Sequence, residues 1–308
     1  MFTVFFFLLF LFLFIGGMTI MRTGLMNLSG ERLKNWLLIF TSRPWKGMLF
    51  GIVVTILLQS SSAVMILTVG LISAKLLTFR KSIGIILGTN IGTTATIELI
   101  AFGTEEMIFP FLLIGSICLL FSKKSFRSIG LFFFGIGSVF FAMAGFEQLA
   151  KPLSNTSFLS SLFIQMNKEL LIAAFVGTVI TAIIQSSTAV TGMAIGFLQE
   201  NILSLPGAIA VMLGSNIGTC FDALIAGIGG GKEARLTAYA HIWLNVFGVV
   251  LFFPFLESFA QFTTVLSPFP DQQLAHASFL FNFVVSLIVL PFSTPFSIFV
   301  EKVHGSVQ

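Results

Sequence analysis

Charged side chains are scarce in this sequence, and the scarcity excludes most classes of protein. Asp, Glu, Lys and Arg together make up 9% of the 308 residues, where a soluble protein would carry about a quarter. The hydrophobic fraction is 56%, and a spanning helix needs about 20 mostly apolar residues. The composition therefore predicts an integral, multi-pass membrane protein surrounded by a lipid bilayer.

Residue types that carry redox or hydrolytic chemistry are also few. The two cysteines, Cys118 and Cys220, lie in apolar sequence, which predicts free buried thiols and neither a disulfide nor a metal site. The sequence contains no spacing of transition-metal ligands, no phosphate-cradling nucleotide loop and no Gly-x-Ser-Gly serine with a histidine partner. We therefore expect no enzymatic activity, no cofactor and no nucleic-acid partner.

What the sequence does contain is a duplicated polar pattern inside apolar segments. Gln-Ser-Ser-Ser at Gln59–Ser62 is followed, 29 residues after its glutamine, by Gly88–Thr93. The pattern returns 126 residues later as Gln185–Thr188 and Gly214–Thr219, and 18 of 54 ungapped positions around it are identical. This identity indicates an internal duplication. Polar breaks at matched positions in two halves are typical of a transporter whose binding site lies near the middle of the membrane.

The breaks also predict local structure. Each Gln-led cluster divides an apolar segment into halves of about a dozen residues, too few to span a bilayer. We therefore predict two re-entrant helical hairpins, at 47–74 and 169–199, with a polar cluster at each tip. The Gly-x-Asn-Ile-Gly-Thr runs predict two broken transmembrane helices, at 82–102 and 206–228. Irregular backbone of this kind survives at membrane depth only where it is buried in protein or lines a cavity.

The predicted fold is all-α, with two repeats of inverted topology and a C-terminal helix. The first repeat contains a retained helix at Phe2–Met21, an interfacial helix at Glu31–Phe40 and a crossing at Met107–Phe121. The last helix, Leu274–Val300, should be kinked by its prolines. The two repeats and the tail occupy residues 1–128, 129–256 and 257–308.

The distribution of Lys and Arg predicts the orientation of the chain. If both hairpins return to the side that they enter, 14 of the 16 lysines and arginines lie on one side. The positive-inside rule makes that side cytoplasmic, which places the N-terminus outside and the C-terminus inside the cell membrane. Each repeat then has three crossings and one hairpin. The odd number inverts the second repeat, so the two hairpin tips can meet near the midplane.

The polar clusters offer partners for an anion and small cations together. Backbone N–H groups at a helix break donate to an anion, and hydroxyls both donate and accept. Carbonyl and hydroxyl oxygens at such breaks are the ligands that hold Na⁺. Neither cluster contains Lys or Arg, so co-bound cations would have to balance the anion's charge. Packing between helices would explain an isolated run of serines, but not a pattern duplicated at the same spacing.

The paired pattern resembles the type II sodium-phosphate cotransporter family and its bacterial relatives. The resemblance covers both repeat cores, and Thr188 keeps a hydroxyl where the family pattern has serine. It implies sodium-coupled uptake of inorganic phosphate by alternating access. The implied phosphate-binding residues are Gln59, Ser60, Ser61, Ser62, Gln185, Ser186, Ser187 and Thr188. The implied sodium ligands are Gln59, Asn90, Thr93, Gln185, Asn216 and Thr219.

Asp222 is added to the sodium ligands for a different reason. It lies three residues after Thr219 in apolar sequence, and the matched position in the first copy is Thr96. Acidic side chains inside a membrane mark functional sites by default. Asp222 therefore either senses a cation or bonds a neighbouring helix.

Other functions stay open at this point. The same architecture could carry another small oxyanion or a carboxylate with Na⁺. An ion channel would conduct without strict dependence on Na⁺, and a phosphate sensor would need a soluble output domain. The expected partners are inorganic phosphate, Na⁺ as the coupling ion and the bilayer; Na⁺ is the one metal ion expected, and a homodimer is left open.

Overall fold

The computed structural model describes residues 2–29 and 43–305, and all regular structure within them is helical. Six segments of the described chain are long and apolar enough to cross a membrane. These findings confirm an all-α, multi-pass membrane protein. The predicted interfacial helix at Glu31–Phe40 lies outside the described residues. The six candidate spans are Phe2–Leu28, Phe79–Ala101, Lys124–Ser154, Leu205–Gly227, Lys232–Leu266 and Pro270–His304.

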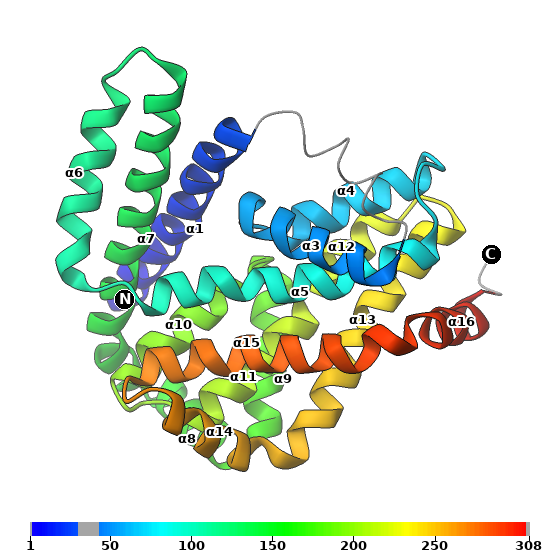
Figure 1. Cartoon of the computed structure of the whole chain (residues 1–308). Helices are drawn as coiled ribbons and strands as arrows, with labels where there is room; N and C mark the ends of the chain where they lie inside the picture. Colours follow the sequence, from blue (N-terminus) through cyan, green and yellow to red (C-terminus); the bar gives the residue numbers. More distant parts are fainter. Residues whose placement is uncertain (1, 30–42, 306–308) are drawn as a thin grey trace.

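The helices of the first half form two groups (Figure 1). Helices α1, α6 and α7 pack together at one end of the molecule, and α3 packs along α5. Their bounds, with one 3₁₀ turn, are α1 Phe2–Ser29, α3 Pro44–Leu58, α4 Ser61–Ser73, α5 Phe79–Ala101, η1 Glu105–Met107, α6 Ile108–Leu119 and α7 Lys124–Ser154.

Two of these helices differ from the predicted spans. The first helix was expected to end at Met21, but α1 continues to Ser29, because apolar residues resume at Leu25. The predicted crossing at Met107–Phe121 contains the short helix α6, of 12 residues. At 1.5 Å per residue α6 is about 18 Å long, which is less than the roughly 30 Å of a bilayer core.

In the second half α9 packs along α11, as α3 does along α5. Short 3₁₀ turns that contain Pro254 and Pro291 separate α13 from α14 and α15 from α16, which confirms the expected kink in the last helix. Proline removes a helical hydrogen bond and so favours such a bend. The bounds are α8 Ser157–Lys168, α9 Leu170–Ile184, α10 Ser187–Gln199, α11 Leu205–Gly218, α12 Cys220–Gly227, α13 Lys232–Phe252, α14 Leu256–Leu266, α15 Pro270–Val289 and α16 Ser293–His304.

The glutamine of each polar cluster ends one helix, and a new helix begins two residues later. Gln59 follows α3 with φ 49° and ψ 35°, and Gln185 follows α9 with φ 58° and ψ 33°. Both values lie in the left-handed region, which commonly terminates helices. The hydroxyls of Ser60 and Ser186 then accept the backbone N–H of the residue three positions later, at the N-caps of α4 and α10. Matched positions thus adopt the same local structure.

The predicted break in the first Gly-x-Asn-Ile-Gly-Thr run is wrong. Helix α5 is continuous through Gly88–Thr93. In the second copy α11 gives way to α12 at Thr219 alone, and Thr219 keeps helical dihedral angles. The glycines serve close packing instead of an irregular backbone. A Cβ on Gly88 would collide with the carbonyl oxygen of Met48, and a Cβ on Gly214 with the carbonyl oxygen of Ala174.

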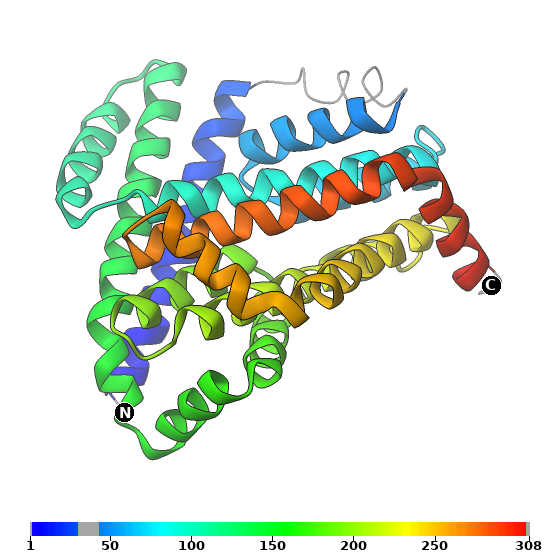
Figure 2. The same ribbon diagram turned by 60° about the horizontal axis from the view of Figure 1, so that its bottom comes forward.

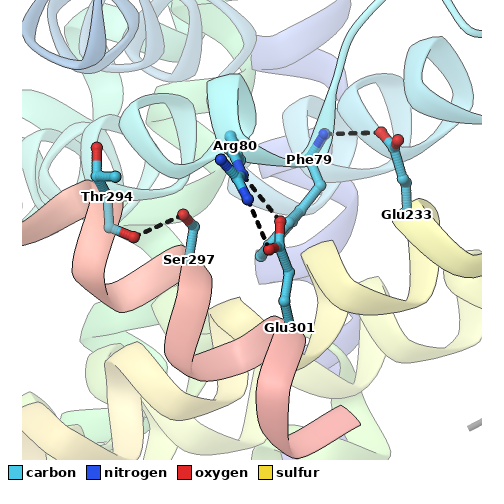
Figure 3. Close-up of polar contacts among 6 residues, drawn as sticks. All are labelled: Phe79, Arg80, Glu233, Thr294, Ser297 and Glu301. Atoms are coloured by element: carbon cyan, nitrogen blue, oxygen red, sulfur yellow. Dashed lines mark hydrogen bonds and ion pairs between the residues drawn. The ribbon is translucent and has the colours of Figure 1, made fainter. Parts of the chain in front are cut away.

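Helices α5 and α15, which are far apart in the sequence, lie side by side in both views (Figures 1 and 2). The hydroxyl of Ser286 on α15 donates to the carbonyl oxygen of Leu87, 3.1 Å away. The N-terminal end of α5 is also fixed (Figure 3). Its first N–H, on Phe79, donates to the Glu233 carboxylate at 3.0 Å, and Arg80 donates twice to Glu301 of α16.

Candidate functional site

One cavity of about 280 Å³ collects both polar clusters. The break after α3 and the break after α9 lie on the same cavity, although 126 residues separate their glutamines. Helix α1 contributes one wall, and α5 and the end of α11 contribute others. The residues that line it are Ile15, Met18, Thr19, Arg22, Gln59, Ser60, Ser61, Ser62, Thr93, Thr96, Ile184, Gln185, Ser186, Ser187, Thr188 and Thr219.

All eight residues predicted to bind the anion therefore line one cavity, with Thr93 and Thr219 among the predicted sodium ligands. A water molecule takes about 30 Å³ of the liquid. The cavity consequently has room for a tetrahedral oxyanion together with cations or water.

The hydroxyl groups at the helix starts have unused hydrogen-bonding capacity. Ser61, Ser187 and Thr188 are buried, and their hydroxyls make no hydrogen bond to the described residues. The first backbone N–H groups of α4 and α10 lack partners within their own helices, as at every helix start. The N-terminal ends of the two helices also carry partial positive charge. The starts of α4 and α10 thus both present hydrogen-bond donors without partners to the cavity.

Two threonines offer oxygen atoms that only accept. The Thr93 hydroxyl donates to the carbonyl oxygen of Thr89 at 2.8 Å, and the Thr219 hydroxyl donates to that of Ser215 at 2.9 Å. Because each hydroxyl proton is used within its helix, the lone pairs of the oxygen remain for a cation. This arrangement suits Na⁺ better than an anion.

The two glutamines are held differently. The Gln59 side chain accepts from the Thr96 hydroxyl at 2.5 Å and donates to the carbonyl oxygen of Ile56 at 2.7 Å. The Gln185 side chain is exposed and makes no hydrogen bond to the described residues. The first glutamine is therefore fixed by the protein, while the second is available to a ligand.

Asp222 connects the two copies. Its carboxylate accepts a hydrogen bond from the hydroxyl of Ser62. Both residues line a second cavity of about 440 Å³, which shares Ser60, Ser62, Gln185 and Arg22 with the first. The sequence left Asp222 either as a cation ligand or as a bond to a neighbouring helix. The structure provides the bond and keeps the carboxylate at the wall of a cavity.

The two asparagines lie elsewhere. The Asn90 side chain donates to Asn245 at 3.0 Å and faces His241 at 3.2 Å, so it joins α5 to α13. The Asn216 amide faces the sulfur of Met212 at 3.8 Å. Neither asparagine lines the two cavities that hold the glutamines. Their predicted role as sodium ligands gains no support from this placement.

Sequence reasoning missed Arg22. Both Gln-led clusters lack Lys and Arg, so the site was expected to offer no cationic side chain. Because α1 continues past Arg22, this side chain lines both cavities instead of a polar loop. The apolar residues that follow, such as Leu25 and Leu28, were the available signal. Within the described residues, no group of His, Cys, Asp and Glu could hold a transition metal.

The sequence was compared with protein-family models and with known proteins, and the matches belong to related phosphate-transport families or have no assigned function. The sequence model described as "Na+/Pi-cotransporter" matches residues 13–148 and 151–269. The chain is 41% identical over 283 residues to "Uncharacterized protein YqeW" of Bacillus subtilis, covering 92% of each protein. It is 25% identical over 292 residues to "Putative inorganic phosphate export protein YjbB" of Escherichia coli, covering 94% of this chain and 54% of that one.

A shorter match reaches an animal protein. Over 60 residues the chain is 45% identical to human "Sodium-dependent phosphate transport protein 2B", covering 20% of this chain and 9% of the human protein. The chain spans about half of the length of YjbB. No solved structure matches it.

Proposed function

The chain belongs to the Na⁺/Pi-cotransporter family, and from this membership we propose that it is a sodium-coupled secondary transporter of inorganic phosphate. One observation carries the proposal: the two Gln-led clusters line a single cavity from matched helix breaks. The cavity combines anion donors with oxygen atoms suited to Na⁺. Transport would proceed by alternating access to this cavity from the two sides of the membrane.

The proposed membrane architecture consists of two inverted repeats with re-entrant hairpins. The helix pairs α3–α4 and α9–α10 have 15 and 13 residues each, or about 22 and 20 Å, less than a bilayer core. The matched caps and left-handed glutamines support a common origin for the two pairs. The inversion requires that the chain between Glu105 and Lys124 cross the membrane through the short helix α6.

The orientation is proposed from the distribution of Lys and Arg, with the N-terminus outside and the C-terminus in the cytoplasm. Cysteine-accessibility labelling at positions 105 and 124 tests it together with the inversion. Labelling of the two positions from opposite faces is expected. Labelling from the same face would contradict both the crossing at α6 and the inverted repeats.

In the proposed site, phosphate contacts the free N–H groups and hydroxyls of the two clusters. Na⁺ contacts oxygen atoms of Thr93, Thr219 and Asp222 and the glutamine carbonyl groups. The bound cation offsets negative charge on phosphate, so each ligand should raise the affinity of the other by the same factor. A coupling of roughly 5–150-fold, or about 1–3 kcal/mol, is typical.

The decisive test is uptake of radiolabelled phosphate into proteoliposomes, with a Na⁺ gradient and with K⁺ or choline as replacement. Uptake driven by the Na⁺ gradient is expected. Competition by unlabelled sulfate and small carboxylates tests the choice of anion. Phosphate flux that is the same in K⁺ as in Na⁺ would contradict coupling and favour a channel.

A second candidate function is export of phosphate from the cell instead of uptake. YjbB carries the name "Putative inorganic phosphate export protein". A coupled transporter moves its substrate in either direction according to the gradients, so the same site serves uptake or export. Phosphate efflux from loaded proteoliposomes, measured with Na⁺ inside or outside, compares the two directions. Faster efflux than uptake under mirrored gradients would favour export.

A further inference from the structure

Arg22 occupies an unusual place for a cationic side chain. It projects from α1, a helix that is otherwise free of charged residues. It lines both the 280 Å³ cavity and the 440 Å³ cavity, which Ser60 and Gln185 also line. Arg22 is also the one charged residue among those that line the 280 Å³ cavity.

The guanidinium has no partner in the described part of the chain. Its Nε atom is buried without a hydrogen bond, and the described residues form no ion pair with it. Asp222 lines one of the same cavities, but its carboxylate accepts from Ser62 instead. An arginine inside a membrane protein is costly unless it is paired. With five N–H donors and no acceptor, it lacks a negatively charged partner.

The other polar residues of the 280 Å³ cavity carry uncharged hydroxyls and amides, so none of them supplies a negative charge. We infer that Arg22 binds the transported oxyanion through paired N–H donors of its guanidinium. This inference rests on the proposed function. It also changes the charge balance at the site: one negative charge on the anion is met by a fixed cation, and Na⁺ has to offset only the remainder. The planar guanidinium suits two oxygens of a tetrahedral anion, whereas lysine presents a single point charge.

The experiment compares five forms of the full chain purified in detergent: wild type, Arg22→Gln, Arg22→Lys, Arg22→Gln with Asp222→Asn, and Arg127→Gln. The last form is the matched control, because it removes an exposed arginine from the start of α7. Equilibrium binding of radiolabelled phosphate and sulfate is measured at saturating Na⁺ and without Na⁺. Size-exclusion profiles report whether each form is folded.

Loss of a charged hydrogen-bonding group should raise the half-saturating phosphate concentration of Arg22→Gln at least about tenfold. Arg22→Lys should raise the half-saturating phosphate concentration several-fold, and Arg127→Gln should bind phosphate with wild-type affinity. Wild-type affinity in Arg22→Gln would overturn the inference. Recovery of binding when Asp222→Asn is added to Arg22→Gln would also overturn it, since the arginine would then serve the carboxylate. If Arg22→Gln does not fold, wild-type affinity in Arg22→Lys overturns the paired-donor contact.

The wild-type measurements separate this inference from the proposed function. Binding of sulfate instead of phosphate, lost in Arg22→Gln, would remove phosphate as the substrate and support Arg22 as the anion contact. Binding of phosphate that needs Arg22 but is indifferent to Na⁺ would contradict cotransport alone. A wild-type chain that binds neither anion would overturn both.

Discussion

In the first copy of the duplicated segment, Thr96 donates to the glutamine at the helix break; in the second copy the matched residue is Asp222, which accepts from Ser62 of the first copy. The backbones at the two breaks are nearly the same, with φ values of 49° at Gln59 and 58° at Gln185. The two segments therefore share the geometry that exposes donors at their helix starts. The charges and side-chain hydrogen bonds around that geometry differ.

The two copies differ in the charged side chain that each contributes. The first copy adds Arg22 to the 280 Å³ cavity, and the second adds Asp222 to the 440 Å³ cavity, which Arg22 also lines. Gly16 and Gly24 of α1 recur 121 residues later as Gly137 and Gly145 of α7, and this alignment matches Arg22 with Met143. Two copies with identical side chains would bind one kind of ligand twice. These copies place a cation on one side and an anion on the other, which suits the joint binding of an oxyanion and Na⁺.

Removing the charge that distinguishes the second copy is expected to have the largest effect. Asp222→Asn keeps the shape of the side chain and an acceptor for Ser62, but it removes the carboxylate. The Na⁺ concentration for half-maximal phosphate uptake should rise roughly 10–150-fold, the range for loss of a charged contact of about 1.5–3 kcal/mol. A Na⁺ titration of uptake in proteoliposomes measures it.

The control is Glu257→Gln, which neutralises an exposed carboxylate on α14. Unchanged Na⁺ dependence in Asp222→Asn would show that Asp222 only bonds a neighbouring helix. The comparison between the copies would then concern packing and not charge.

The glycines test the part of the comparison that should be the same in both copies. Gly88→Ala and Gly214→Ala each force a Cβ against a backbone carbonyl of the neighbouring helix. Overpacking of this kind typically costs about 1–3 kcal/mol, and the two variants should lose similar thermal stability. Gly70→Ala is the matched control, because a Cβ there meets nothing within 4 Å. A loss confined to one copy would break the structural equivalence of α3–α5 and α9–α11.

The two N-caps should also be equivalent, with a smaller effect. Ser60→Ala and Ser186→Ala each remove a hydroxyl that accepts a backbone N–H, at 3.1 and 3.2 Å. Loss of an N-cap costs about 1 kcal/mol, so both should lower the unfolding temperature, measured without phosphate, by similar amounts. Ser161→Ala, which removes an exposed hydroxyl from α8, serves as the control. Unequal losses would mean that the two helix starts differ in stability.

The smallest effect is expected from the bond that only the first copy has. Thr96→Val removes the donor to Gln59 and keeps the side-chain volume. A net hydrogen bond is worth about 0.5–1.5 kcal/mol, so the half-saturating phosphate concentration should rise about twofold to tenfold. Thr94→Val is the control on the same helix, since the Thr94 hydroxyl bonds only to Ile91 within α5. No change in Thr96→Val would mean that the position of Gln59 does not depend on Thr96.

Much of the fold could be predicted because local composition decides it. Apolar runs long enough to span a bilayer indicated a membrane protein. The break at Gln59 could be predicted because a polar cluster interrupts an apolar segment there. The Gly-x-Asn-Ile-Gly-Thr run misled for an equally local reason. Glycine permits either an irregular backbone or close packing, and the sequence does not say which. In α5 Gly88 packs closely against the backbone of Met48, and the helix is continuous through the run.

By itself, the sequence determined the membrane class, the repeated polar pattern and the eight polar residues of the two clusters, because these follow from residue type and spacing along the chain. Only the tertiary structure decided which other side chains meet those clusters. Arg22 reaches the cavity because α1 extends past it, and Asp222 meets Ser62 from 160 residues away. Asn90 instead joins Asn245 between α5 and α13. Such contacts depend on how separate helices pack, and the spacing of residues within one segment carries no record of that packing.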